Sequence, residues 1–509
     1  MHIRIAALLL LGCSTASAGP AIRWQPALSP QVFAQAEAQH RYVLLDLHAV
    51  WCHWCHVMDT QTYVDPAVVK LIGEHYIAVG VDADSSPELS ARYGDWGWPA
   101  TIVLAANGSE IVKRRGFIAP ENMASMLQAI VDDPSPGPSV QPVLALRVTT
   151  AATLSAALTA QVALRVDDAY DQDRGGWGNG QKFLDAGAMS LLLEAAAQGD
   201  AKAKQRAQQT LDANLHLLDP EWGGVYQYSD KPDWLSPHFE KIMSYQADDL
   251  SLYSRAYALW PEPRYLAAAQ AIRGYLKSFL TSPQGAFYVS QDADLNATVT
   301  GHDYYALSGK QRRALGLPRV DKHVYARESG WAIAALCRFG EATHDASALK
   351  DAARAAHWIQ LNRALPGGGY AHDAMNTGGP YLADTLAMGE AFLALYRATN
   401  DHVWLKRAGE AVVFIEKNFH DAAGGWDTAP ATTGARGVLN QAVRVLDENV
   451  AVTRLASGLW RESGDDPWRS SATHGISYVA HAAAAAPNAF MPGVLLASRE
   501  FSAAAQAKK

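Results

Sequence analysis

The sequence is poor in cysteine and carries no excess of positive charge. Its 509 residues include only four cysteines, too few for a disulfide scaffold. Lysine and arginine number 43 and aspartate and glutamate 51, for a formal charge of -8, and no long basic run occurs. We therefore expect no nucleic-acid partner. Beyond the N-terminal segment no apolar stretch is long enough to cross a bilayer, so the mature chain is predicted to have no transmembrane span.

The N-terminal segment has the pattern of an export signal. Arg4 precedes the apolar run 5–11, and the small residues 16–18 form an A-x-A site. This pattern predicts a signal peptide over residues 1–18, cleaved before Gly19, and a protein exported to the periplasm. A second interpretation treats Cys13 as a lipidated cysteine that anchors the protein to a membrane.

The next part of the sequence has the element order of a thioredoxin. The β-prone run 42–48 directly precedes a pair of cysteines, and Asp65-Pro66 marks the start of a helix. A second strand follows, and the Asn107-Gly108 turn indicates a hairpin. A last helix is predicted over 120–131. We assign residues 19–133 to a thioredoxin-like α/β domain.

Proline and serine are concentrated in residues 134–142, which we interpret as a linker. Residues 143–509 then form an all-α domain. Twelve helices are predicted in it, over residues 148–171, 186–198, 201–217, 243–259, 263–280, 328–343, 346–362, 381–398, 401–419, 446–462, 466–484 and 488–503.

Glycine-containing turns recur in the helical domain after five of the six odd-numbered helices. These turns contain Gly175-Gly176, Gly223-Gly224, Gly285, Gly367-Gly368-Gly369 and Gly424-Gly425. Their recurrence indicates stacked equivalent hairpins. Connections from odd to even helices are long and the others short, so the long loops gather at one end. We predict a closed (α/α)6 toroid of the six-hairpin glycosidase type, with the even-numbered helices inside and any site at their N-terminal ends.

The motif Trp51-Cys52-His53-Trp54-Cys55-His56 lies where a strand leads into a helix. Two intervening residues let the sulfurs meet across the first helical turn, and the positive end of the helix favours a thiolate at the first cysteine. Cys52 is therefore the predicted nucleophile and Cys55 the resolving thiol. The expected neighbours of this redox site are Trp51, His53, Trp54, His56 and a cis proline at Pro99.

Three other interpretations of this motif were weighed. Residues 52–56 also match C-x-x-C-H, the attachment pattern for c-type haem. A thioredoxin helix packs against its sheet, however, and leaves little room for a porphyrin. Cys52, His53, Cys55 and His56 could ligate Zn²⁺ or Cu⁺, but all four come from one helical turn. The pair could also be a purely structural disulfide. Redox chemistry is favoured, and we expect neither a cofactor nor a metal.

Several segments resemble the spermatogenesis-associated protein 20 family, which includes the bacterial YyaL-like proteins. They are CHWCHVM, GVDADSSPELS, GWPATIVL, DQDRGGWGNGQKF, WLSPHFEKIM, TSPQGAFYVSQDAD and YLADTLAMGEAFLALYRATND, in the order of the family. The resemblance covers nearly the whole mature chain. It implies a thioredoxin fold joined to a six-hairpin toroid akin to glycosidases and sugar epimerases, but it implies no particular substrate.

Polar residues in the long loops form a candidate site in the toroid. The residues selected are His238, Glu240, Lys241, Asp292, Asp294 and Asp384. Paired carboxylates suit general acid–base hydrolysis of a sugar, whereas an epimerase would need two bases, such as His238 with His302 or His372. Acidic residues at helix starts also act as simple caps.

Three functions follow from these patterns. The leading hypothesis is an exported thiol–disulfide oxidoreductase with a protein thiol or disulfide as partner and a toroid that binds a partner or ligand. The second is a carbohydrate-active hydrolase or epimerase that binds a sugar-like ligand in the toroid. The third is a non-catalytic binding protein.

Overall fold

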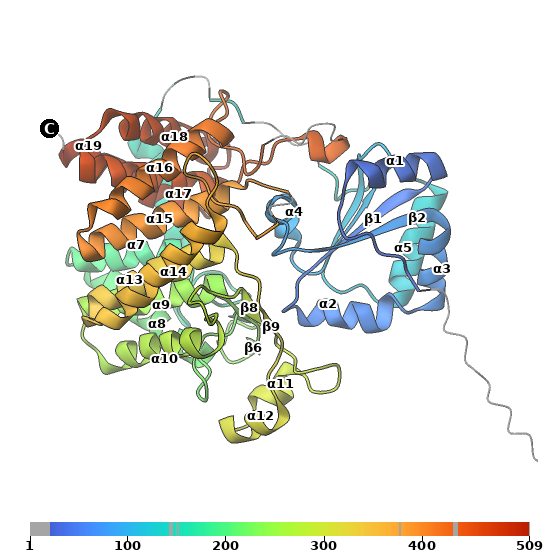
Figure 1. Ribbon diagram of the computed structural model, residues 1–509, viewed down its shortest axis with the longest axis horizontal. Coiled ribbons are helices and arrows are strands. Elements are labelled where there is room, and N and C mark those ends of the chain that lie inside the picture. The colour runs from blue at the N-terminus through green and yellow to red at the C-terminus, as the bar shows by residue number, and fades with distance from the viewer. Residues whose placement is uncertain are drawn as a thin grey trace, which may run out of the picture.

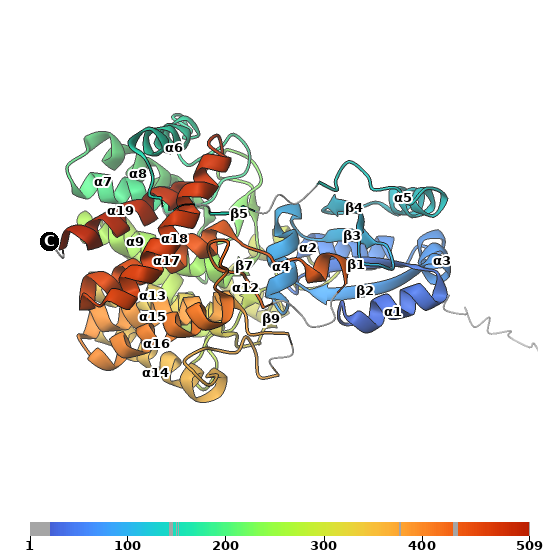
Figure 2. The same ribbon diagram turned by 90° about the horizontal axis from the view of Figure 1, so that it is seen from above.

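The computed structural model describes residues 21–141, 146–148, 150, 152–375, 378–430 and 436–507. The predicted signal peptide and Cys13 lie outside these residues. An α/β domain stands beside a larger all-α domain (Figures 1 and 2). In the described residues, no helix combines the length and the apolar composition needed to cross a membrane.

The α/β domain contains a four-stranded mixed sheet of order β2-β1-β3-β4, in which β1 and β2 are parallel and the other neighbours antiparallel. Its elements are α1 Pro30–Gln39, β1 Tyr42–His48, α2 His53–Val57, η1 Met58–Thr62, α3 Pro66–His75, β2 Tyr76–Asp82, α4 Pro87–Tyr93, η2 Gly94–Trp96, β3 Ala100–Leu104, β4 Glu110–Arg115 and α5 Pro120–Asp132. This is the predicted thioredoxin-like order.

Helices cover both faces of this sheet because the side chains of β1 alternate between two apolar cores. Val43 and Leu45 face a core shared with α1 and α4, whereas Leu44 faces one shared with α3 and α5. The toroid also contributes to the first core, through Val438 and Leu439. The two domains are thus joined by apolar packing as well as by polar contacts.

Local signals in this domain act as the sequence predicts. Asp65 caps α3 by accepting hydrogen bonds from Ala67 N and Val68 N, and Pro66 is its first residue. Gly108 has a φ of 83° in the turn between β3 and β4. After α5, the chain runs along the open edge of β4, where Gly137 N donates to the Ile111 carbonyl oxygen.

The all-α domain is built from twelve long helices. They are α6 Ala156–Asp168, α7 Ala186–Ala197, α8 Ala201–Asn214, α9 Met243–Leu259, α10 Pro263–Phe279, α13 Ala326–Thr343, α14 Ala346–Arg363, α15 Leu382–Thr399, α16 His402–Phe419, α17 Leu446–Ser463, α18 Asp466–Ala485 and α19 Pro492–Ala507. Helices α7, α9, α13, α15, α17 and α19 each contact the next, and α19 contacts α7. The inner ring is therefore closed, and the even-numbered helices of the prediction form it.

Long connections gather at the N-terminal ends of the inner helices. They carry the short elements η3 Leu215–Leu217, β5 Tyr228–Ser229, β6 Pro237–His238, β7 Lys241–Ile242, β8 Ser290–Gln291, α11 Gly301–Tyr305, α12 Gly309–Leu315, β9 Val320–Asp321 and η4 Gly437–Asn440. Strands β7, β8 and β9 form a small sheet. This rim faces the α/β domain.

The five glycine turns are equivalent, as the repeat predicts. An isolated antiparallel bridge closes each one: Tyr170–Trp177, Leu218–Val225, Thr281–Phe287, Ala364–Tyr370 and His420–Trp426. At Gly223, φ is 71° and a Cβ would lie 2.3 Å from the Ala271 carbonyl oxygen. Only glycine fits this close approach between turn and helix.

The first and last of the predicted helices begin well after their predicted starts. The first helix was expected from residue 148, but α6 begins at Ala156, where the Ser155 hydroxyl accepts from Leu158 N. Val148 N instead donates a hydrogen bond to the Ala423 carbonyl oxygen. The last helix begins at Pro492, four residues later than predicted, because proline is favoured in a first helical turn.

Candidate functional site

The two cysteines lie at the start of α2, directly after β1. Cys52 and Cys55 form a disulfide, and Cys52 Sγ caps the helix by accepting a hydrogen bond from Cys55 N at 3.1 Å. The Trp98–Pro99 peptide bond is cis, and Trp98 packs against the cysteines. The arrangement places the first sulfur at the positive end of a helix, where a thiolate is stabilised.

The disulfide is covered by the toroid. Each cysteine is only 3% exposed, and Ile242 of the toroid packs against them together with Ala49 and Trp51. Trp54, in contrast, is 43% exposed and lies beside Phe117 of its own domain. Only part of the motif therefore remains open to solvent while the domains are docked.

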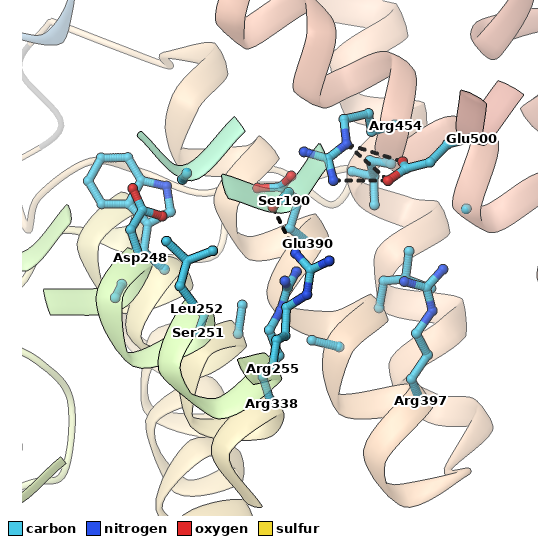
Figure 3. A pocket seen from close by; sticks show the side chains of 18 of the residues that line it. Ser190, Asp248, Ser251, Leu252, Arg255, Arg338, Glu390, Arg397, Arg454 and Glu500 are labelled. Carbon is cyan, nitrogen blue, oxygen red and sulfur yellow. Dashed lines mark hydrogen bonds and ion pairs between the residues drawn. The ribbon is translucent and has the colours of Figure 1, made fainter. Parts of the chain in front are cut away.

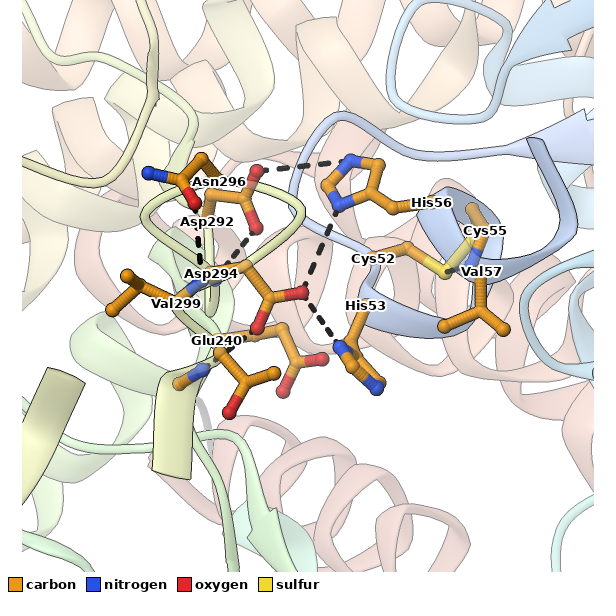
Figure 4. Close-up of polar contacts among 12 residues, drawn as sticks. Cys52, His53, Cys55, His56, Val57, Glu240, Asp292, Asp294, Asn296 and Val299 are labelled. Atoms are coloured by element: carbon orange, nitrogen blue, oxygen red, sulfur yellow. Dashed lines mark hydrogen bonds and ion pairs between the residues drawn. A yellow bond between two sulfur atoms is a disulfide. The ribbon is translucent and has the colours of Figure 1, made fainter. Parts of the chain in front are cut away.

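Two histidines of the motif face two aspartates of the toroid (Figure 4). His53 Nδ1 donates to Asp294 Oδ2 at 2.6 Å. His56 lies between the carboxylates, with Nε2 at 3.7 Å from Asp292 Oδ2 and Nδ1 at 4.0 Å from Asp294 Oδ2. The candidate residues from the two halves of the sequence thus meet in one composite site at the domain interface.

The charges of this site depend on one another. Interaction with Asp294 raises the pKa of both His53 and His56 against the opposing effect of burial. Burial alone would raise the pKa of Asp294, but its contacts with these histidines hold it below the usual value. Burial raises the pKa of Asp292 to about 6. The site thus sets two histidines with raised pKa values against two buried carboxylates.

A second set of polar contacts joins the domains beside the motif. Trp51 Nε1 donates to Asp84 Oδ2 at 2.7 Å, and Arg327 Nη2 lies 4.0 Å from Asp84 Oδ1. His372 Nε2 donates to the Asp84 carbonyl oxygen at 2.8 Å, while its Nδ1 donates to Asp384 at 2.9 Å. Both ring nitrogens of His372 thus act as donors, which requires the imidazolium form. The α/β domain therefore sits on the N-terminal ends of inner helices α13 and α15.

The six candidates of the toroid have different surroundings. Glu240 is buried, and in the described residues its Oε2 has no hydrogen-bond partner, although His238 Nδ1 lies 3.7 Å away. Asp384 accepts from His372 and from Arg327 N. Together with Asp292 and Asp294, these residues line the rim that the α/β domain covers.

Lys241 is part of a buried ion cluster within the toroid. Its Nζ donates to Asp219 Oδ2 at 2.7 Å, and Arg312 Nη1 donates to the same carboxylate. All three side chains are fully buried. Lys241 thus holds the loop together rather than reaching into the rim. His302 also lies elsewhere, on α11 with 88% of its side chain exposed.

The sequence analysis did not single out Asp84 and Arg327. Asp84 belongs to the GVDADSSPELS segment, which marked the family resemblance but suggested no role of its own. Arg327 precedes Glu328 at the start of α13, and its guanidinium donates to that carboxylate at 2.8 Å. Their common signal is a charged residue at a strand end or helix start, which is too frequent to be selective.

A central cavity of about 520 Å³ is lined by all six inner helices (Figure 3). Arginines and carboxylates both line it; Arg454 Nη2 donates to Glu500 at 2.9 Å and Arg255 Nη1 donates to Ser190 at 2.7 Å. Burial raises the pKa of Asp248 and of Glu390 to about 7. The sequence analysis did not predict this cavity, because its residues are spread over six helices.

The pH dependence of domain docking can be predicted from Asp84. Burial, with Asp82 and Glu328 nearby, raises its pKa to about 7 against the effect of Arg327. A carboxyl group with a raised pKa binds a proton on docking, so docking weakens as pH rises from about 4 towards 7. We expect the Cys52–Cys55 disulfide to be reduced roughly tenfold faster at pH 8 than at pH 5.5.

The measurement is the rate of reduction by tris(2-carboxyethyl)phosphine, followed by alkylation of the released thiols. The raised pKa of His53 acts in the same direction, because its stabilising contribution is lost as pH rises through the docked-state value. Asp84→Asn should flatten the part of the profile between pH 5 and 7. A rate that falls with increasing pH would contradict this prediction.

Comparisons with known proteins agree with the two-part architecture. The Thioredox_DsbH family model, described as a protein of unknown function, DUF255, matches residues 15–131. Human spermatogenesis-associated protein 20 is 25% identical over 307 residues, which cover 54% of this chain and 39% of the human protein. The chain is a homologue of spermatogenesis-associated protein 20. The match with this relative spans well under half of the relative's length.

Two further similarities concern the separate domains. Thiol:disulfide interchange protein DsbD 2 of Pseudomonas aeruginosa is 37% identical over 94 residues, 18% of this chain and 16% of that protein. A crystal structure of D-mannose isomerase superposes with a TM-score of 0.53 and 11% identity, covering 68% of this chain and 96% of that one. The chain therefore combines a thioredoxin-like domain, similar to part of DsbD 2, with an (α/α)6 toroid whose fold is similar to that of D-mannose isomerase.

Proposed function

We propose that this protein is a thiol–disulfide oxidoreductase whose dithiol is sheltered by the toroid. The observation that carries the proposal is the Cys52–Cys55 pair at the start of α2, with Cys52 Sγ accepting a backbone hydrogen bond. This placement stabilises a Cys52 thiolate in the reduced protein. Export to the periplasm, an oxidising compartment, is part of the proposal.

In the reducing direction, the Cys52 thiolate attacks a partner disulfide and forms a mixed disulfide, which releases one partner thiolate. The Cys55 thiolate then attacks Cys52 Sγ, which restores the internal disulfide and releases the second partner thiolate. Two electrons pass from the dithiol to the partner. In the oxidising direction the same steps run backwards.

Access to the sulfurs requires a change at the domain interface. Both cysteines are buried beneath Ile242, and the histidines between them and the toroid are paired with Asp294. A protein partner cannot reach a sulfur that is 3% exposed. We propose that the toroid controls this access and thereby selects the partner.

A trapping experiment tests the proposal. The Cys55→Ser variant, expressed in the native host and quenched with acid, should accumulate a mixed disulfide through Cys52, because the resolving thiol is missing. Cys337→Ser is the matched control, since that thiol is buried and its pKa is raised to about 12 by burial. The adduct should be absent from the control and from a Cys52→Ser/Cys55→Ser double variant.

Failure of Cys55→Ser to trap any partner, combined with a disulfide that does not equilibrate with glutathione mixtures, would overturn the proposal. Equilibration is read from the ratio of alkylated to unalkylated protein by mass spectrometry. The two measurements together separate an inactive disulfide from one whose partner is missing in the growth conditions.

A second candidate function is acid–base chemistry on a sugar at the same rim. Glu240 has an unpartnered Oε2 in the described residues, and burial raises the pKa of Asp292 to about 6, within the range useful for a general acid. Support also comes from the likeness of the toroid fold to a sugar isomerase. A screen of sugars with Glu240→Gln as control would separate the two functions, because loss of the dithiol should leave sugar turnover intact.

A further inference from the structure

Three ligand-type side chains converge where the two domains meet. His56 of α2 and the two aspartates that follow β8, Asp292 and Asp294, place one ligand atom each within 4.8 Å of one another. We propose that His56, Asp292 and Asp294 bind a divalent transition metal ion, with Zn²⁺ as the representative ion. The site would join the helix that begins at the disulfide to the rim of the toroid.

The spacing of the atoms fits a small tetrahedral ion after minor adjustment. Metal–ligand distances of 2.0–2.2 Å place neighbouring tetrahedral ligands about 3.3 Å apart. His56 can bind an ion through only one ring nitrogen: Nε2 lies 3.7 Å from Asp292 Oδ2, Nδ1 lies 4.0 Å from Asp294 Oδ2, and one ligand atom from each of the three residues lies within 4.8 Å of the others. The ligand atoms would have to draw together by up to about 1.5 Å, a movement shared among the three side chains.

The two aspartates are held in place through their other oxygen atoms. Asp292 Oδ1 accepts from Asp294 N at 3.0 Å, and Asp294 Oδ1 accepts from Gly301 N at 2.7 Å. Both Oδ2 atoms face His56, and Asp294 Oδ2 also accepts from His53 Nδ1 at 2.6 Å (Figure 4). Backbone anchoring of this kind orients carboxylate ligands before a metal binds.

Glu240 provides an independent sign that the site takes a cation. It is 3% exposed, and its Oε2 has no hydrogen-bond partner in the part of the chain that the structure describes. Figure 4 places its carboxylate beside Asp294 and His53. A buried carboxylate oxygen without a hydrogen bond is costly, and a nearby divalent ion would offset that cost beyond what His238 Nδ1, 3.7 Å away, supplies. His53 would not bind the metal itself; by donating to Asp294 it would hold that carboxylate in orientation.

The ligand set decides the class of metal. One imidazole and two carboxylates suit Zn²⁺ and similar first-row ions, whereas Mg²⁺ and Ca²⁺ prefer oxygen ligands alone. Cys52 and Cys55 are bonded to each other and supply no thiolate. The site is thus distinct from the cysteine-based metal site that was weighed from the sequence. With three protein ligands, one coordination position stays open for water.

The experiment uses the full chain after removal of metals with EDTA. Isothermal titration with Zn²⁺ is carried out on oxidised wild type and on the Cys52→Ser/Cys55→Ser double variant, in which no thiolate can bind the ion. We expect one Zn²⁺ per chain in both. Asp292→Asn and His56→Gln should each weaken binding by at least about tenfold.

Asp303→Asn is the matched control, because this exposed carboxylate lies on α11 close to the site in sequence and should leave the affinity unchanged. His56 is 35% exposed, so His56→Gln should still fold even if an aspartate variant does not. The electronic spectrum of a Co²⁺ complex should have the intense visible bands of a tetrahedral site. Absence of a Zn²⁺ site in the wild type, or unchanged affinity in both ligand variants, would overturn the proposal.

This inference is independent of the redox function. The double serine variant has no dithiol yet keeps all three ligands, so loss of redox activity leaves the metal measurement unaffected. If Zn²⁺ binds and no mixed disulfide forms, the redox proposal alone fails; if a partner is trapped and no Zn²⁺ binds, the metal site alone fails.

Discussion

Asp294→Ala is expected to increase the rate at which a small reductant reaches the Cys52–Cys55 disulfide by about 10- to 100-fold. In the docked protein, Asp294 accepts from His53 at 2.6 Å and lies 4.0 Å from His56. Its removal takes away the carboxylate that accepts from His53 and one of the two carboxylates that face His56, at a largely buried interface. A loss of about 1.4–2.8 kcal/mol in docking free energy corresponds to this range of rates, since 1.4 kcal/mol is tenfold.

The measurement is pseudo-first-order reduction by tris(2-carboxyethyl)phosphine at pH 7 in the presence of EDTA, which keeps any bound metal out of the comparison. Asp303→Ala removes an exposed carboxylate of the neighbouring helix α11 and should reduce at the wild-type rate. If Asp294→Ala also reduces at the wild-type rate, contacts of the toroid with the histidines do not limit access to the sulfurs.

Asp219→Asn is expected to lower the free energy of unfolding of the toroid by about 3–5 kcal/mol. Asp219 is fully buried between Lys241 and Arg312, and Arg312 Nη1 contacts both of its carboxylate oxygens, at 2.9 and 2.7 Å. These cations hold the pKa of Asp219 below its usual value although burial opposes this. Without the carboxylate, two buried cations would face each other unpaired.

Lys241→Met tests the same cluster from the other side. This change leaves Asp219 paired with Arg312, and it also relieves a lysine whose pKa burial lowers to about 8. We therefore expect a smaller loss, about 1–2 kcal/mol, mainly from the hydrogen bonds that Lys241 makes. Urea unfolding followed by circular dichroism gives both values. Equal losses in the two variants would contradict the asymmetric role assigned to Asp219.

The fold was predictable because its signals are local and repeated. Asp65-Pro66 starts a helix and Asn107-Gly108 makes a turn whatever surrounds them. The twelve helices follow from apolar periodicity, and the glycine turns, such as Gly223-Gly224, fix the phase of the hairpins. The start of α6 was missed because several possible capping residues, Thr149, Thr150, Thr153 and Ser155, occur in this stretch, and Ser155 is the one that accepts from Leu158 N.

The composite site was predictable only in its parts. Cys52, His53, Asp292 and Asp294 were all candidates, but the contact between His53 and Asp294 joins residues 241 positions apart. No local pattern specifies such a pairing, and an aspartate in a loop is equally compatible with a cap. The position of Lys241 could not be predicted for the same reason. A buried ion cluster and a polar rim use the same charged residue types, so the sequence does not distinguish them.

Closure of the helical ring imposes an order on how this protein can assemble. The inner ring is complete only when α19 packs between α17 and α7. Until then, apolar side chains of α19's partners, such as Val450 and Leu191, lack their cover. While a ribosome or a translocation channel still holds this last helix, the inner ring of the toroid therefore cannot close. The four strands of the α/β sheet all lie within residues 42–115, so this sheet can form first and gain Val438 and Leu439 of the toroid when the domains dock.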